Sequence, residues 1–161
     1  MHVTGNANLG NLLCNIKTVF LIDGDLSLFP EIDTPAADDG CVFIVQGKTT
    51  ITAGFNKGSN DTTPITNYDE IHAFIITNSF ETQTDPGGDG LLIEGGVITT
   101  IVNTNAPTSF NRNLGLLRNQ DAPAEIFRYD GTRYMYLFGD LFTYEKNYNI
   151  REKQFIQSLN N

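Results

Sequence analysis

Basic residues are scarce in this chain of 161 residues. Lysine and arginine together number 10 against 19 aspartates and glutamates, so the formal net charge is -9, and the isoelectric point is about 4.4. Nucleic-acid binding requires clustered lysine and arginine to contact phosphates, and anionic membrane surfaces attract the same residues. The charge balance therefore argues against both kinds of partner.

Long apolar segments are also missing. No run of about 18 apolar residues occurs, which excludes a membrane-spanning helix. Residues 1–5 lack the basic segment and the apolar core of a signal peptide. Because strand-like sequence begins almost at once, we expect the upstream part of the protein, with any signal segment, to lie outside this sequence. The alternative is a protein that is not secreted.

Cysteine and histidine are rare as well. Cys14 and Cys41 have neither a C-x-x-C spacing nor the histidine spacing of a zinc site. We expect two buried thiols, with a disulfide as the alternative if the compartment is oxidising. A catalytic cysteine is not expected, because neither His2 nor His72 has sequence support as a base. No phosphate-binding loop, Ser–His–Asp set or dinucleotide fingerprint is present.

Short apolar runs organise the first two thirds of the chain. Each run is β-branched or aromatic and ends in a polar residue followed by Gly or Asn. The four clear runs are residues 19–24, 42–47, 73–78 and 91–95, and a weaker one is 3–5. Gly and Asn enter left-handed backbone at least cost, so we predict tight bends at Gly5, Gly24, Gly47, Asn78 and Gly95. Intervals of 19, 23, 31 and 17 residues separate these bends.

This recurrence favours an all-β fold, a short right-handed parallel β-solenoid. A single coil cannot bury its apolar face alone, whereas stacked coils align like residues into ladders around one core. The alternative is an antiparallel β-sandwich, which also combines short strands with Gly and Asn turns. We assign residues 1–123 to solenoid coils and residues 124–161 to a C-terminal cap and tail of the same domain.

The cap is predicted from a change in periodicity. Tyr134, Leu137, Phe138 and Leu141 form an apolar stripe with helical spacing. A solenoid end exposes unpaired backbone groups that natural proteins cover. We therefore expect residues 124–145 to cover the last coil.

If the coils stack at the predicted bends, four polar residues share one column. They are Asp23, Gln46, Thr77 and Glu94. We interpret this column mainly as the hydrophilic corner of the solenoid. The alternative is a carbohydrate-binding or hydrolytic row, because glycosidases use two carboxylates about 5–10 Å apart. Asp23 and Glu94 would be those carboxylates.

Acidic residues also gather in loops, most densely in residues 84–90. Asp85 and Asp89 lie there among glycines, and Ca²⁺ takes about 6–8 oxygen ligands, backbone carbonyls included. We expect a solvated acidic turn, with a Ca²⁺ site at these two residues as the alternative. No other cofactor is predicted.

Charged residues concentrate in and near the cap. They are Arg112, Glu125, Arg128, Asp130, Arg133, Arg151 and Glu152. We expect a structural network in which arginines pair with carboxylates. The alternative is a ligand site formed by Arg128, Arg133 and Tyr134 with the neighbouring Tyr129 and Tyr136, because Tyr beside Arg is common at contact surfaces.

Several segments carry a resemblance to a known family. They are residues 111–115, 123–130, 133–138 and 150–152, with the upstream runs 42–47, 73–78 and 91–98 in the same order. Across residues 40–155 the chain resembles the C-terminal β-helical region of uncharacterised cell-surface proteins of uncultured small-genome bacteria. These proteins are similar to pilus-associated or polymer-forming proteins. The resemblance implies an extracellular or cell-surface β-helical module and no particular activity.

Together these observations predict a non-catalytic structural or adhesive module of a cell-surface or filament-forming protein. The expected partners are other copies of the chain, cell-surface proteins and glycans. The N-terminal edge is the expected site of end-to-end assembly, because no capping segment precedes Val3. The alternative is a carbohydrate-active β-helical enzyme or a phage tail-spike-like depolymerase that acts from the polar column.

Overall fold

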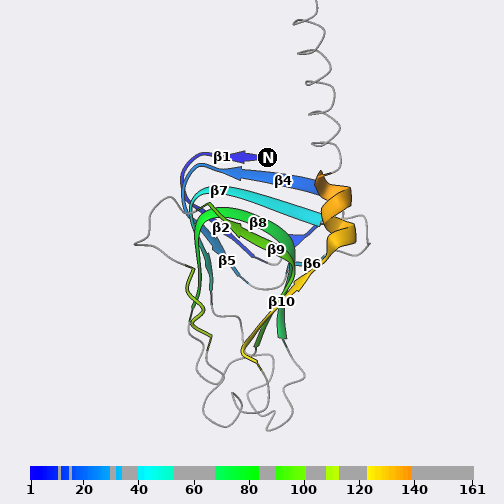
Figure 1. Ribbon diagram of the computed structural model, residues 1–161. Helices are drawn as coiled ribbons and strands as arrows, with labels where there is room; N and C mark the ends of the chain where they lie inside the picture. The colour runs from blue at the N-terminus through cyan, green and yellow to red at the C-terminus, as the bar shows by residue number, and fades with distance from the viewer. Residues whose placement is uncertain are drawn as a thin grey trace, which may run out of the picture.

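The structure is a computed structural model that describes much of the chain as parallel strands (Figure 1). The described residues are 1–10, 12–14, 16–29, 32–33, 40–52, 68–83, 90–100, 108–112 and 123–138. Their strands are β1 (His2–Val3), β2 (Ala7–Leu9), β3 (Leu12–Leu13), β4 (Lys17–Ile22), β5 (Leu26–Leu28), β6 (Ile32–Asp33), β7 (Gly40–Ile51), β8 (Tyr68–Thr82), β9 (Gly90–Thr99) and β10 (Glu125–Tyr129). One helix spans residues 131–138. The predicted all-β class is confirmed.

Every pairing between the described strands is parallel. The longest stack runs β1, β4, β7, β8, β9, β10, and Figure 1 shows its first four strands lying one below another. A second stack joins β2, β5 and the end of β7, and a third joins β3, β6 and the start of β8. The antiparallel sandwich is therefore wrong for these residues. The solenoid itself and its right-handed winding stay predictions.

The register places like residues above one another in the core. Phe20, Phe43 and Ile75 hold the same position in β4, β7 and β8, and all three are buried. The rings of Phe20 and Phe43 stack with their centroids 4.9 Å apart. Full burial of one such side chain contributes about 1.5–3 kcal/mol. The interior ladder is therefore a principal source of stability, and it fixes the register of the polar residues outside it.

Three predicted bends lie at one corner of the stack. The Gly24 N–H donates to the Gly5 carbonyl, and the Gly47 N–H donates to the Gly24 carbonyl, each at 3.1 Å. A Cβ on Gly47 would lie 2.7 Å from the Gly24 carbonyl oxygen, so the close approach of the windings requires glycine there. Asn78 occupies the same corner in the next winding, where its side-chain amide donates to the Gln46 carbonyl.

A ladder of polar side chains follows this corner. The Asn6 Oδ1 accepts the Asp25 backbone N–H at 2.9 Å, and the Asp25 Oδ1 accepts the Lys48 backbone N–H at 2.8 Å. Each oxygen thus satisfies a backbone donor of the winding that follows. The ladder stops at Lys48, whose side chain has no acceptor.

The prediction of a bend at Gly95 is wrong. Gly95 lies inside β9, directly opposite Ala73 of β8. Its φ is 147°, and an added Cβ would lie 2.1 Å from the Ala73 carbonyl oxygen. Close contact between two strands therefore explains this glycine. The corner of the winding falls at Thr100 instead, where the backbone N–H donates to the Thr77 carbonyl at 2.8 Å.

The predicted cap, residues 124–145, divides into two parts with different roles. Its first part is β10, which pairs with β9 and so extends the stack. The helix, residues 131–138, lies against the side of the stack (Figure 1), where Leu137 and Phe138 pack on Val42 and Phe74. The apolar stripe of the helix thus covers outward-facing residues of β7 and β8, while β10 pairs with the edge of β9. The cap over the last coil stays a prediction.

The helical periodicity itself is confirmed. Tyr134, Leu137 and Phe138 share the face that contacts the sheet, and they lie within the helix. The fourth predicted residue of the stripe, Leu141, is outside the described residues.

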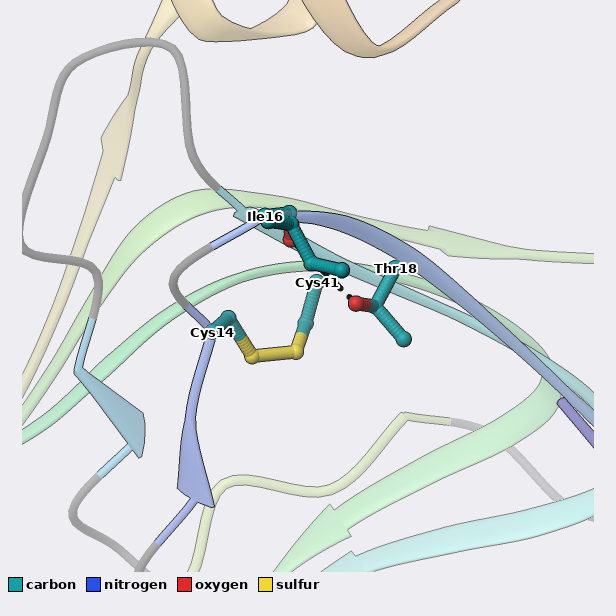
Figure 2. Close-up of a disulfide and its surroundings, with 4 residues drawn as sticks. All are labelled: Cys14, Ile16, Thr18 and Cys41. Atoms are coloured by element: carbon teal, nitrogen blue, oxygen red, sulfur yellow. Dashed lines mark hydrogen bonds between the residues drawn. A yellow bond between two sulfur atoms is a disulfide. The ribbon is translucent and has the colours of Figure 1, made fainter.

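Cys14 and Cys41 form a disulfide (Figure 2). Their Cα atoms are 5.8 Å apart, and both residues are buried. The expectation of two thiols is therefore wrong, and the alternative is correct. The bridge joins the segment after β3 to the start of β7, beside the turn in which the Thr18 hydroxyl donates to the Ile16 carbonyl.

Candidate functional site

Three neighbouring strands place charged side chains at the same position. His72 of β8 lies opposite Glu94 of β9, and Glu94 lies opposite Arg128 of β10. Arg128 Nη1 is 2.7 Å from Glu94 Oε1, and the other Glu94 oxygen is 3.2 Å from His72 Nδ1. We call His72, Glu94 and Arg128 the charged row.

Further charges extend the row at the His72 end. His72 Nε2 is 3.0 Å from Glu70 Oε2, and Arg133 Nη1 is 3.5 Å from His72 Nδ1. Arg133 also donates its backbone N–H to Asp130 Oδ1 at 2.9 Å. The His72 side chain is 15% exposed. Carboxylates thus face both ring nitrogens, and this arrangement orients the ring.

The predicted polar column does not form. Ile22, which precedes Asp23, lies in register with Val45 and, one winding further, with Thr77. Glu94 pairs with His72, five residues before Thr77. At about 3.3 Å per residue, Glu94 is displaced from the level of Thr77 by about 17 Å along the strand direction. Glycosidase carboxylates lie about 5–10 Å apart, so Asp23 and Glu94 do not form such a pair.

Asp23 and Thr77 have structural partners of their own. Asp23 Oδ1 is 2.9 Å from His2 Nε2 at the exposed edge of the first two windings. Thr77 is buried; its hydroxyl donates to the Gly47 carbonyl at 2.9 Å and accepts from the Thr49 hydroxyl at 3.0 Å. These contacts tie neighbouring windings together.

The other predicted ligand residues come close to the charged row. Arg133 reaches His72, as described above, and is itself buried. Tyr134 follows it in the helix and packs on Phe74, with ring centroids 5.4 Å apart. The structure therefore brings Glu94, Arg128 and Arg133 together and places Tyr134 in the helix–sheet interface. The contribution of His72 was missed, although its i, i+2 spacing from Glu70 in a strand places both side chains on one face.

Arg112 belongs to a separate ion pair. Its Nη1 is 3.2 Å from Asp69 Oδ2, its Nη2 donates to the Thr52 carbonyl at 3.1 Å, and its backbone N–H donates to Glu125 Oε1 at 3.0 Å. The predicted arginine–carboxylate pairing is thus present, but it is split between this buried site and the charged row. Arg151 and Glu152 are outside the described residues.

The structure describes neither of the predicted calcium ligands, Asp85 and Asp89. In the part of the chain that it does describe, no group of three or more His, Cys, Asp or Glu side chains is arranged to hold a metal ion. The same part contains no helix with the length and apolar character needed to cross a membrane.

An aromatic pocket lies beside the charged row, at the β9–β10 end of the stack. Its volume is about 530 Å³. The described residues that line it are Ile93, Gly95, Gly96, Val97, Thr99, Thr108, Phe110, Phe127, Arg128 and Tyr129. The sequence patterns did not reveal it, because Phe110 and Phe127 come from segments 17 residues apart and meet only in the fold.

The described residues define an all-β protein of parallel strands, with a disulfide, a charged row and an aromatic pocket. Comparison of the chain with protein-family models, curated protein sequences and solved structures finds no match.

Proposed function

We propose that this chain is a non-catalytic structural or adhesive module of a cell-surface or filament-forming protein. The observation that carries the proposal is the disulfide between Cys14 and Cys41. Disulfides form and persist in oxidising environments, among them secreted and cell-surface locations. The resemblance of residues 40–155 to cell-surface β-helical proteins supports the same setting.

The strand pairing supports a mechanical role. Each winding hydrogen-bonds to the next through parallel ladders from β1 to β10. Buried hydroxyls such as those of Thr49 and Thr77 link windings inside the stack. Such one-dimensional stacking presents long side-chain rows to a partner surface.

The pairing of charges supports a non-catalytic role. Glu94 is held by Arg128 and His72, Asp23 by His2, and Glu81 by Lys48, whose Nζ is 3.0 Å from Glu81 Oε1. Most glycosidases need two carboxylates placed around one scissile bond. The contacts of these residues are those of ion pairs across adjacent windings.

The test uses the oxidised full chain in three parallel assays. Sedimentation and electron microscopy measure assembly, beads coated with the chain measure attachment to bacterial envelopes, and a reducing-sugar assay measures cleavage of envelope polysaccharides. We expect assembly or attachment, and no sugar release.

The control beads carry the double variant Cys14→Ala/Cys41→Ala in its urea-unfolded form. Attachment of these beads measures binding by exposed apolar chain, and any attachment above that level is due to the folded protein. Sugar release that Glu94→Gln abolishes would overturn the proposal in favour of the depolymerase. A strictly monomeric chain whose beads attach no better than the control beads would overturn it as well.

A further inference from the structure

We propose that the aromatic pocket at the β9–β10 end binds a neutral sugar ring of a glycan. This inference deepens the adhesive role proposed above by naming its ligand class, and it rests on that role for its biological setting. The geometry of Phe110, Phe127 and Tyr129 carries it.

The walls of the pocket are aromatic side chains that the fold leaves open. Phe127 continues the interior position of Ile93 into the last strand, yet it is 43% exposed, and Phe110 and Tyr129 are 56% and 66% exposed. By contrast, Ile93 itself is buried. Contiguous exposed apolar surface marks an interaction site, so these rings are available to a ligand.

The rings are fixed by contacts behind them. Phe110 and Phe127 meet edge to face with centroids 5.1 Å apart, and both lie against buried Phe80. Tyr129 meets Phe74 edge to face at 6.3 Å. A pocket wall held in place before binding loses little conformational entropy when a ligand arrives.

The floor of the pocket is shaped by glycine. Gly95 and Gly96 line it, and the strand contact described above excludes a side chain at Gly95. Because Gly95 and Gly96 have no side chains, a flat ligand face can reach their backbone between the aromatic rings. A volume of about 530 Å³ lies inside the range of about 300–1,000 Å³ that is usual for small-molecule sites.

The polar rim selects a ligand that both donates and accepts hydrogen bonds. Arg128 supplies only donors, while the hydroxyls of Thr99 and Thr108 on the pocket wall supply both donors and acceptors. The 2.7 Å contact between Arg128 and Glu94 balances their charges, so the rim does not favour an anion. A neutral sugar has apolar C–H faces bordered by hydroxyl groups. The C–H faces can pack on the aromatic rings, and the hydroxyl groups can hydrogen-bond to the polar rim.

The experiment is calorimetric titration of the oxidised full chain with three neutral hexasaccharides, those of β-1,4-glucose, β-1,4-mannose and β-1,4-N-acetylglucosamine. An oligogalacturonate of equal length is the acidic comparison. Tyr129→Ala removes one wall and Arg128→Gln removes the donor fork. Tyr136→Ala is the matched control, because Tyr136 is 47% exposed on the helix and is outside the pocket-lining set.

We expect at least one neutral hexasaccharide to bind, with an affinity that falls about tenfold in Tyr129→Ala and about tenfold in Arg128→Gln. Tyr136→Ala should change it less than about twofold. Circular dichroism melting verifies that each variant is folded. If Tyr129→Ala does not fold, Arg128→Gln alone decides.

Three results would overturn the inference: no heat with any neutral hexasaccharide at about 10 mM, tighter binding of the oligogalacturonate, or an equal loss in Tyr136→Ala. The bead assay distinguishes this failure from failure of the proposed function. If beads carrying Arg128→Gln still attach as the unaltered chain does, the adhesive module stands and the sugar site falls.

Discussion

The guanidinium of Arg112 lies 3.2 Å from the carboxylate of Asp69, and their side chains are 0% and 2% exposed. The pair fastens residues 108–112 to β8 from inside the protein. Replacing a buried ion pair by apolar residues is often neutral, whereas removing one partner leaves an uncompensated charge. The two halves of the pair are therefore expected to be far more costly to lose singly than together.

Arg112→Met should lower the free energy of unfolding by about 3–5 kcal/mol, because it leaves Asp69 buried without its counter-ion. Urea unfolding followed by circular dichroism measures the change. The matched control is Lys48→Met, which breaks the partly exposed pair with Glu81 and should cost at most about 1 kcal/mol. The double variant Arg112→Met/Asp69→Leu should recover part of the stability that Arg112→Met loses. Equal losses in Arg112→Met and Lys48→Met would contradict the buried pairing.

Removal of the disulfide should destabilise the first windings most. For a sequence separation of 27 residues, loop-closure entropy gives about 3.5 kcal/mol. Cys14→Ala/Cys41→Ala should lower the free energy of unfolding by about this amount, and hydrogen exchange should accelerate in β1–β3 before β8. Uniform acceleration across the chain would show that the bridge does not act locally. A reductant should reproduce the effect in the unaltered chain and leave the double variant unchanged.

Gly95→Ala should be more damaging than an alanine at a roomy glycine. The new Cβ would lie 2.1 Å from the Ala73 carbonyl oxygen at a φ of 147°, so strands β8 and β9 must separate. We expect a loss of about 2–4 kcal/mol from overpacking and backbone strain. Gly5→Ala is the control, because its φ is +88° but no atom lies within 4 Å of the added Cβ. Thermal melting of both variants should rank them, and a Gly5 variant as unstable as the Gly95 variant would contradict the strand contact.

Leu137→Ala should loosen the helix from the sheet. Leu137 is buried on Val42 and Phe74, and truncation of a buried leucine costs about 2–5 kcal/mol. Urea unfolding gives the size of the loss, and binding of an apolar dye should report the uncovered sheet face. Met135→Ala, at a residue that is 60% exposed, should cost less than about 0.5 kcal/mol. Similar losses for the two variants would show that the helix does not use its apolar stripe.

The parallel stacking could be predicted because the same pattern recurs at each winding. Phe20 and Phe43 occupy the same place in two apolar runs, and Gly24 and Gly47 follow them at the same distance. Recurrence of strand and corner together leaves few other ways to bury the apolar face. The pattern also predicted the helical stripe of Tyr134, Leu137 and Phe138, because its period differs from that of a strand.

The candidate site could be predicted only in part. Arg128 and Arg133 come from one charge-rich segment, whereas the place of Glu94 beside them depends on register. A glycine that lets two strands approach looks the same in sequence as a glycine that turns a corner. Reading Gly95 as a corner moves Glu94 five positions, from His72 to Thr77, and so creates a polar column that does not form. In the same way, the pairing of Arg112 with Asp69 depends on contacts across 43 residues of sequence, which no local pattern carries.

The corner ladder has a consequence for how such a domain grows. Asn6 and Asp25 both present an oxygen to the backbone amide of the following winding. A second copy of residues 6–24 inserted after Gly24 would therefore donate its first backbone N–H to the original Asn6 oxygen. The Asn6 oxygen of the copy would in turn accept the backbone N–H of Asp25. Tandem duplication at that point would therefore lengthen the corner ladder with the same kind of hydrogen bond, although its second Cys14 would have no partner, because Cys41 is already bonded to the first. Lys48 offers no such oxygen, so it marks the level beyond which an added repeat would need a different neighbour.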